Sequence, residues 1–135
     1  MVTKMDQMVV YRVECPNSRS GMYRVSSMAL SKMCDRNQHP GPQNDNRLML
    51  EISEKGMESD ESWHLIDQKC RFGFASKKQM RKWISDDEWK SKLAAEGLMV
   101  AKYQVPKSSV AIGKTQAIYR PENATLLEHM CPTKI

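Results

Sequence analysis

Apolar and polar positions alternate clearly in the middle of this chain and predict a strand that leads into a helix. In residues 71–74 aromatic side chains flank Gly73, the pattern of a half-buried strand. Ser76 and Gln79 then have the spacing of a capping box, so we expect a helix to begin at Ser76. Apolar side chains recur at i, i+3 and i+4 on one face of this helix: Met80, Trp83 and Ile84.

The same patterns predict further elements on both sides. Residues 8–14 are rich in β-formers and predict a first strand, in which Arg12 and Glu14 share one face. A second capping box at 85–88 starts another helix, which Gly97 ends. Strands are then expected at 98–105, 110–112 and 116–119.

Four other segments are less regular. Residues 27–34 have roughly helical spacing, and residues 47–52 alternate in the manner of a strand. Residues 35–46 contain two prolines, a glycine and several amides, which fit neither period and predict a long loop. From Pro121 onward we expect a tail that includes a short helix.

The order of these elements predicts one α+β domain over residues 1–135, with mainly antiparallel β-sheets and helices packed on them. Its core is expected at about 8–119, with 120–135 as a C-terminal tail. No stretch is long and apolar enough to cross a membrane, and the first residues lack the plan of a signal peptide. We therefore expect a cytoplasmic protein whose four cysteines are free thiols.

The formal net charge of +5 makes an acidic surface or a nucleic acid an easy partner. Cations of the central helix fall on one outward stripe: Lys77, Lys78, Arg81 and Lys82. With Phe72, Phe74 and Trp83 nearby, this stripe fits nucleic-acid binding, a protein interface, or simply a solvated helix face.

Metal binding and common catalytic motifs find little support. Cys34 with His39, and His64 with Cys70, offer nitrogen and sulfur ligands, but no C-x-x-C pair is present, so no metal is expected. Cys70 beside Arg71 fits a buried strand cysteine better than a nucleophile. The chain also lacks a G-x-S-x-G elbow, a Walker A loop and a G-x-G-x-x-G turn.

Three pieces of the chain, in order, resemble the plan of small ADP-ribosyltransferase-like proteins: Tyr11-Arg12-Val13, Phe72-Gly73-Phe74-Ala75-Ser76 and Gly113-Lys114-Thr115-Gln116-Ala117-Ile118. That family has an arginine on its first strand, a serine where a middle strand opens a helix, and an acidic element on a later strand. The chain is also similar to a class of uncharacterised small bacterial and bacteriophage proteins, through its Y-R-V-E opening, H-P-x-P loop, F-A-S corner and G-x-x-Q ending.

The resemblance implies an ADP-ribosyltransferase-like fold and NAD as the cofactor. Arg12 would hold a phosphate of NAD, and Ser76 would order the nicotinamide-ribose end. Tyr23 or Phe74 would stack on nicotinamide, and both alternatives stay open. Arg12, Ser76 and Gln116 would form the catalytic set.

One position departs from the family pattern. A carboxylate is expected where Gln116 stands, to stabilise the ribosyl cation that forms during transfer, and Ile118 occupies the alternative place for a glutamate. Losing such a group commonly lowers the rate about a hundredfold or more. Glu14 or Glu122 could supply a carboxylate from elsewhere in the fold.

Three functions follow from these observations. The first is transfer of ADP-ribose from NAD to a host macromolecule by a bacteriophage-type accessory protein. The second is a non-catalytic inhibitor that binds a host or defence protein through the basic helix and the 35–46 loop. The third is direct binding of nucleic acid, which added salt would weaken steeply.

Overall fold

The computed structural model describes residues 6–16, 45–57, 70–84 and 87–135. The described helices are α2 (Asn46–Glu54), α3 (Lys77–Trp83) and α4 (Asp87–Ala95). The described strands are β1 (Gln7–Glu14), β2 (Arg71–Gly73), β3 (Met99–Pro106), β4 (Val110–Ile112), β5 (Ala117–Tyr119) and β6 (Thr125–Met130). Single 3-10 turns follow three of these strands: η3 (Lys107–Ser109), η4 (Pro121–Asn123) and η5 (Pro132–Lys134).

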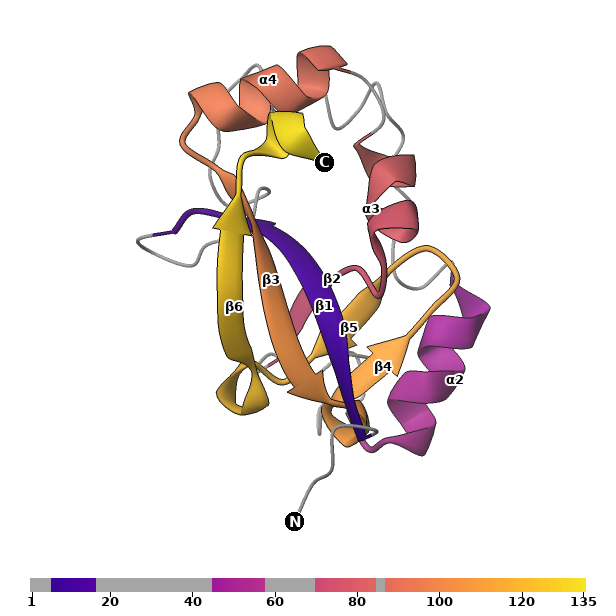
Figure 1. The fold of residues 1–135 in the computed structure, drawn as a ribbon. Helices are drawn as coiled ribbons and strands as arrows, with labels where there is room; N and C mark the ends of the chain where they lie inside the picture. The colour runs from indigo at the N-terminus through magenta and orange to yellow at the C-terminus, as the bar shows by residue number, and fades with distance from the viewer. Residues whose placement is uncertain (1–5, 17–44, 58–69, 85–86) are drawn as a thin grey trace.

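The described strands form two antiparallel sheets, with the orders β1-β3-β6 and β2-β5-β4 (Figure 1). β1 and β3 pair along their whole length, from Gln7 opposite Pro106 to Glu14 opposite Met99. The sheets meet where Tyr11 and Phe74 exchange two backbone hydrogen bonds, with N···O distances of 2.8 and 2.7 Å. This crossing holds the end of β2 directly beside β1.

Gly73 permits that close approach. A Cβ atom at this position would lie 2.7 Å from the carbonyl oxygen of Tyr11 and 2.8 Å from a methyl carbon of Val10. Both distances are too short for a carbon atom, so a side chain here would push β2 away from β1.

The two faces of β1 serve different layers. Tyr11 and Val13 belong to the core beneath the helices, whereas Val10 packs in the core shared with β3, β4 and β5. Because side chains alternate along a strand, Arg12 and Glu14 lie on the same face as Val10, toward the second sheet. The charged residues of β1 therefore point into the molecule.

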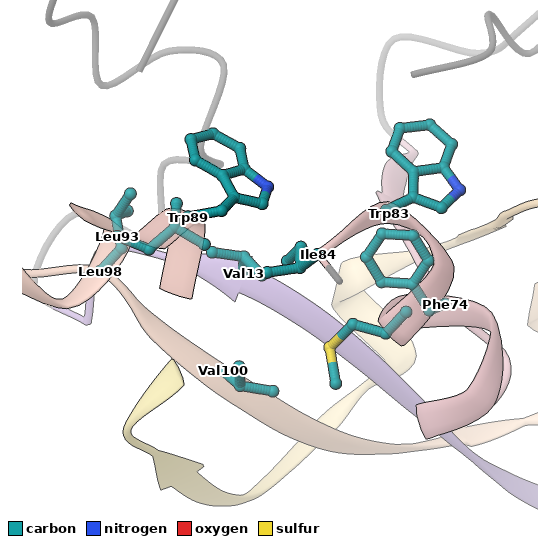
Figure 2. Packing of buried hydrophobic residues seen from close by; sticks show 9 residues of the cluster. Val13, Phe74, Trp83, Ile84, Trp89, Leu93, Leu98 and Val100 are labelled. Carbon is teal, nitrogen blue, oxygen red and sulfur yellow. The ribbon is translucent and has the colours of Figure 1, made fainter. Parts of the chain in front are cut away.

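The helix-covered face of the first sheet holds an aromatic core. Val13 and Val100 contribute from the strands, and α3 and α4 contribute Met80, Trp83, Trp89 and Leu93. The rings of Phe74 and Trp83 meet edge to face, with centroids 5.4 Å apart, a geometry worth about 0.5–1.5 kcal/mol beyond simple burial. Figure 2 shows Phe74 against Trp83 at one end of this cluster and Trp89 at the other.

α2 covers the free edge of β4 (Figure 1). Glu51 Oε1 accepts a hydrogen bond from the amide of Ile112 at 3.3 Å, and Lys55 Nζ donates to the carbonyl of Val110 at 2.7 Å. The two side chains also pair with each other at 3.5 Å. They thus occupy backbone groups that an added strand would otherwise use.

Most local predictions are confirmed, and so is the α+β class with antiparallel sheets. Strands lie at the predicted 8–14 and 98–105 within one residue. Ser76 caps α3 by accepting a hydrogen bond from the amide of Gln79 at 3.1 Å. Gly97 ends α4 with a φ of +80°.

Two predictions were wrong. Residues 47–52 lie in α2 rather than in a strand, because Asp45 caps the helix and the buried pair Leu48 and Ile52 is spaced i, i+4. Leu50, the middle of the apparent alternation, is 59% exposed. The segment after Pro121 also differs from the expected tail with a short helix. Its helical parts are the single 3-10 turns η4 and η5, and residues 125–130 between them form β6 and pair with β3.

Several predictions fall on residues that the structure does not describe. They include the helix at 27–34, most of the 35–46 loop, Ser85 of the second capping box, and Tyr23. Within the described residues, no helix has the length and apolar character needed to cross a membrane.

Candidate functional site

An inter-sheet polar cluster, made of Arg12, Glu14, Tyr103, Tyr119 and His129, lies between the two sheets. Its centre is Glu14, whose side chain is completely buried. Tyr103 Oη donates a short hydrogen bond to Glu14 Oε2, and Arg12 Nε donates to Oε1 at 3.2 Å. His129 Nε2 lies 3.7 Å from Oε2.

Strand register brings these side chains together. Arg12 and Glu14 are two residues apart on β1 and so share a face. Arg12, Ala101 and His129 are successive partners across β1, β3 and β6, so an alanine separates the arginine from the histidine. The guanidinium of Arg12 also donates to the carbonyl of Phe72 at 2.7 Å, which ties the cluster to β2.

Tyr119 joins the cluster from β5. Its ring lies 5.7 Å from that of Tyr103, and its buried hydroxyl has no hydrogen-bond partner in the part of the chain that the structure describes. Burial raises the pKa of the Tyr119 phenol far above its usual range, and the nearby charge of Arg12 opposes this only in part. The phenol therefore stays protonated at physiological pH.

The chemistry open to this cluster is ion pairing and proton transfer. A carboxylate, a phenol and an imidazole within contact distance are groups that general acid–base catalysis uses. The side chains of Arg12 and His129 are 12% and 22% exposed, so parts of both reach solvent, whereas the His129 Nε2 atom that faces Glu14 is buried. Buried ion pairs are costly to maintain, which makes the cluster a candidate for function as well as for structure.

A second polar site surrounds the turn at 113–116, which the Gly113 amide closes by donating to the Gln116 carbonyl at 2.8 Å. Asp45, the N-cap of α2, accepts four hydrogen bonds there. One comes from the amide of Leu48 at 3.1 Å and one from the amide of Lys114 at 3.0 Å. The amide and the hydroxyl of Thr115 each donate at 2.8 Å. We call this arrangement the Asp45 clamp.

The hydrogen bonds of the Asp45 clamp stabilise the charged form of the Asp45 carboxylate. Burial by itself raises the pKa of Asp45, but the hydrogen bonds from Thr115, Lys114 and Leu48 outweigh burial, so the pKa lies below its ordinary value. Gly113 allows the carboxylate to come this close, because a Cβ there would collide with Asp45 Oδ2 and with Leu48. The clamp thus fixes the turn against the start of α2.

α3 holds the opposite side of the same turn. Gln79 Nε2 donates to the carbonyls of Gly113 and Lys114, at 3.0 and 3.2 Å. Trp83 Nε1 donates to the carbonyl of Thr115 at 2.8 Å. The turn is therefore fixed between two helices that are far apart in the sequence.

The predicted catalytic set occupies different environments. Arg12 lies between the sheets and bonds to Glu14 and Phe72. Ser76 is exposed and serves as the cap of α3. Gln116 is 3% exposed at the end of the turn, with its amide 3.5 Å from the Thr115 hydroxyl. Ser76 bonds within α3, Gln116 contacts Thr115 and Gly113 of its own turn, and Arg12 bonds to Glu14 and Phe72.

The predicted stacking residues are partly accounted for. Phe74 is 5% exposed and packs on Trp83 in the aromatic core, so its ring faces the interior. Tyr23 lies outside the described residues. Sequence reasoning overlooked Asp45, Tyr103, Tyr119 and His129. The i, i+2 spacing of Arg12 and Glu14 predicted that the two share a face, but not whether that face points to solvent or lines a cleft.

The predicted outward stripe of α3 is confirmed. Its members, which we call the α3 basic face, are all exposed: Lys77, Lys78, Arg81 and Lys82. Within the described residues, none of the four forms an ion pair. Met80 and Trp83, on the opposite side of the helix, are buried.

A metal centre is not apparent in the part of the chain that the structure describes, where no three histidine, cysteine or acidic side chains form a group that could hold an ion. Of the residues considered from the sequence, Cys70 is described, half-buried and not part of a disulfide with another described residue. Cys34, His39 and His64 lie outside the described residues.

Comparison with known proteins places the chain among phage proteins. No solved structure matches it. A relative from Enterobacteria phage T4, described as an uncharacterized 19.7 kDa protein in the motB-dexA intergenic region, is 40% identical over 55 residues. The match covers 41% of this chain and 32% of the relative, so it spans about a third of that protein. The family model described as Bacteriophage T4 Y00F protein matches residues 8–133, from β1 to η5. The chain therefore belongs to the bacteriophage T4 Y00F protein family.

Proposed function

We propose that this phage-family protein is a non-catalytic inhibitor that binds a host or defence protein, using the α3 basic face against an acidic surface of that partner. The observation that carries the proposal is the exposure of all four cations without an ion pair to another described residue. Such a cluster steers an acidic partner toward the helix and favours its binding.

The fixed position of α3 supports this role. Ser76 caps its start, Gln79 and Trp83 bond to the turn at 113–116, and Met80 is completely buried. A helix held in this way loses little conformational freedom when a partner arrives, so less of the interaction energy is spent on ordering.

An acidic protein fits the α3 basic face better than a nucleic acid does. Proteins that bind single strands stack bases on exposed aromatic rings. Of the three aromatic residues near the stripe, Phe74 and Trp83 lie in the core, and Phe72 is 40% exposed. An acidic protein surface requires cations but no stacking platform.

A pull-down with matched variants tests the proposal. The test variant is Lys77→Gln/Lys78→Gln/Lys82→Gln, and the control is Lys92→Gln/Lys107→Gln/Lys134→Gln, which removes the same charge at other exposed positions. Tagged full-length proteins are incubated with host lysate, with and without nuclease. We expect wild type and control to retain a protein that the test variant loses. Equal capture by both variants, or capture that nuclease abolishes, would count against it.

The ADP-ribosyltransferase-like enzyme is the second candidate, and the contact between Arg12 and Glu14 favours it. The chain has Gln116 where the resemblance leads us to expect a carboxylate. Glu14 could supply that carboxylate instead, because its Oε1 lies 3.2 Å from Nε of Arg12, the arginine expected to hold NAD. For this function Arg12 must exchange its bond to Glu14 for a phosphate of NAD, which frees the carboxylate to stabilise the ribosyl cation.

The reaction proposed for this candidate breaks the bond between the ribose C1′ and nicotinamide, which leaves. A nucleophile of the acceptor bonds to C1′ and gives its proton to a base. Wild type and Glu14→Gln are incubated with NAD labelled in the adenylate and with host lysate. Label on a macromolecule, or release of nicotinamide, should appear with wild type and be lost in the variant. If folded wild type gives neither labelled macromolecule nor released nicotinamide, this candidate is excluded.

A further inference from the structure

Lys114 is bonded to both helices that flank its turn. Its amide donates to Asp45 Oδ1 at the start of α2, and its carbonyl accepts from Gln79 of α3 at 3.2 Å. These two bonds use only backbone atoms of Lys114, and its side chain is exposed. The ammonium group is therefore carried on a rigid backbone next to α3.

Arg47 belongs to α2, the helix whose N-cap Asp45 is bonded to the other side of the same turn. It lies in the first turn of α2, two residues after Asp45, and is exposed. Asp45 itself is 4% exposed, and its two oxygens accept four hydrogen bonds. The lone pairs of this acid are thus already used by neutral donors, so it is a poor partner for the ammonium of Lys114 or the guanidinium of Arg47.

We propose that Lys114 and Arg47 extend the α3 basic face into one docking surface, whose occupant is an acidic segment of a partner protein. This inference rests on the proposed binding function and specifies the site. Three chain segments, from α2, the turn and α3, contribute cations, and the Asp45 clamp and Gln79 hold those segments together. The complementary occupant carries several carboxylates along its length.

The extent of the surface makes the inference testable apart from the function itself. If α3 alone binds, the charge of Lys114 is irrelevant to affinity. If the surface is continuous, Lys114 contributes like any cation of α3, about a twofold to fivefold change in Kd for an exposed charge pair. Because the backbone of Lys114 carries the structural bonds, the substitution Lys114→Gln leaves them intact.

The experiment measures binding of a fluorescent poly-glutamate peptide to the full chain at physiological salt. Lys114→Gln is compared with Lys107→Gln, which removes an exposed lysine from another turn, and with the triple variant Lys77→Gln/Lys78→Gln/Lys82→Gln. We expect the triple variant to bind most weakly, Lys114→Gln to lose about twofold to fivefold, and Lys107→Gln to match wild type.

The outcomes separate the two proposals. Loss of affinity in the triple variant, with Lys114→Gln equal to Lys107→Gln, overturns the extended surface and leaves the α3 site standing. Equal binding by the triple variant and wild type, or no binding of the peptide by wild type, overturns both. A duplex DNA of similar charge serves as the other probe. If it binds more tightly and depends on the same residues, the occupant is a nucleic acid and the acidic protein segment is excluded.

Discussion

Asp45 and Glu14 are both buried carboxylates with several close partners, but the partners differ in kind. Those of Asp45 are backbone amides and one hydroxyl, which have no alternative protonation state in water. Those of Glu14 include Arg12, Tyr103 and His129, which are ionisable side chains from three strands. Burial alone therefore does not show whether a carboxylate has a structural or a functional role. The type of donor distinguishes a fixed clamp from a site whose charges can be exchanged.

The largest effect should come from removing the clamp. Asp45→Ala leaves the amides of Leu48, Lys114 and Thr115 without their acceptor, and we expect a loss of about 4 kcal/mol in the free energy of unfolding. Urea denaturation followed by circular dichroism measures it. Asp45→Asn, which keeps one acceptor oxygen, is the control and should lose less. A loss below about 1 kcal/mol for the alanine variant would show that the turn is held by α3 alone.

Neutralising the other carboxylate should cost less. Glu14→Gln keeps an oxygen that accepts from Tyr103, but it no longer neutralises Arg12. Because Arg12 retains its bond to the Phe72 carbonyl and reaches solvent, we expect the free energy of unfolding to fall by about 2 kcal/mol. The double variant Arg12→Met/Glu14→Gln should recover part of it. If Glu14→Gln costs more than Asp45→Ala, the inter-sheet polar cluster is the stronger structural element, and the comparison reverses.

Elements with purely local signals could be predicted from the sequence. α3 is an example, because the Ser76 cap, the apolar positions and the outward cations all lie within nine residues of one another. The shared face of Arg12 and Glu14 on β1 could also be predicted, from their i, i+2 spacing, but its inward direction could not.

What escaped prediction depends on partners distant in the chain. The hydrogen bonds of Asp45 reach Lys114 and Thr115, 69 and 70 residues away, so nothing near residue 45 revealed the clamp. The alternation of Leu48, Leu50 and Ile52 fits a strand and a helix equally, and only the cap decides between them. His129 could not be placed beside Glu14 until residues 125–130 were known to be a strand.

Acid should weaken the Asp45 clamp by protonating one group, the Asp45 carboxylate. The loss of stability should be smaller than that caused by Asp45→Ala or Glu14→Gln. Since the pKa of Asp45 is lowered on folding, the stabilisation from this carboxylate is fully present above its unfolded pKa of 3.8. It is lost as the pH falls through the lower folded value. Wild type should therefore lose more stability than Asp45→Asn on acidification below about pH 4. Urea midpoints at a series of pH values measure this, and parallel curves for the two proteins would argue against the assigned role.

The smallest effect is expected from Tyr119→Phe. The hydroxyl of Tyr119 is buried without a hydrogen-bond partner among the described residues, so its removal relieves a desolvation cost. Stability should stay the same or rise by up to about 1 kcal/mol. Tyr103→Phe is the matched control and should destabilise, because that hydroxyl bonds to Glu14. A clear destabilisation by Tyr119→Phe would mean that the Tyr119 hydroxyl has a hydrogen-bond partner in solution and helps to hold the inter-sheet polar cluster together.

The hydrogen bonds from Glu51 and Lys55 to β4 affect whether neighbouring molecules can associate through this strand. α2 covers the edge of β4, and two charged side chains of this helix occupy the backbone groups of that edge, so a single change of charge can free one of these groups without unfolding a sheet. A molecule altered at Lys55 would keep its sheets and its core and yet offer the backbone of Val110 to a neighbour. We expect such a molecule to associate through this one backbone group while its sheets stay folded.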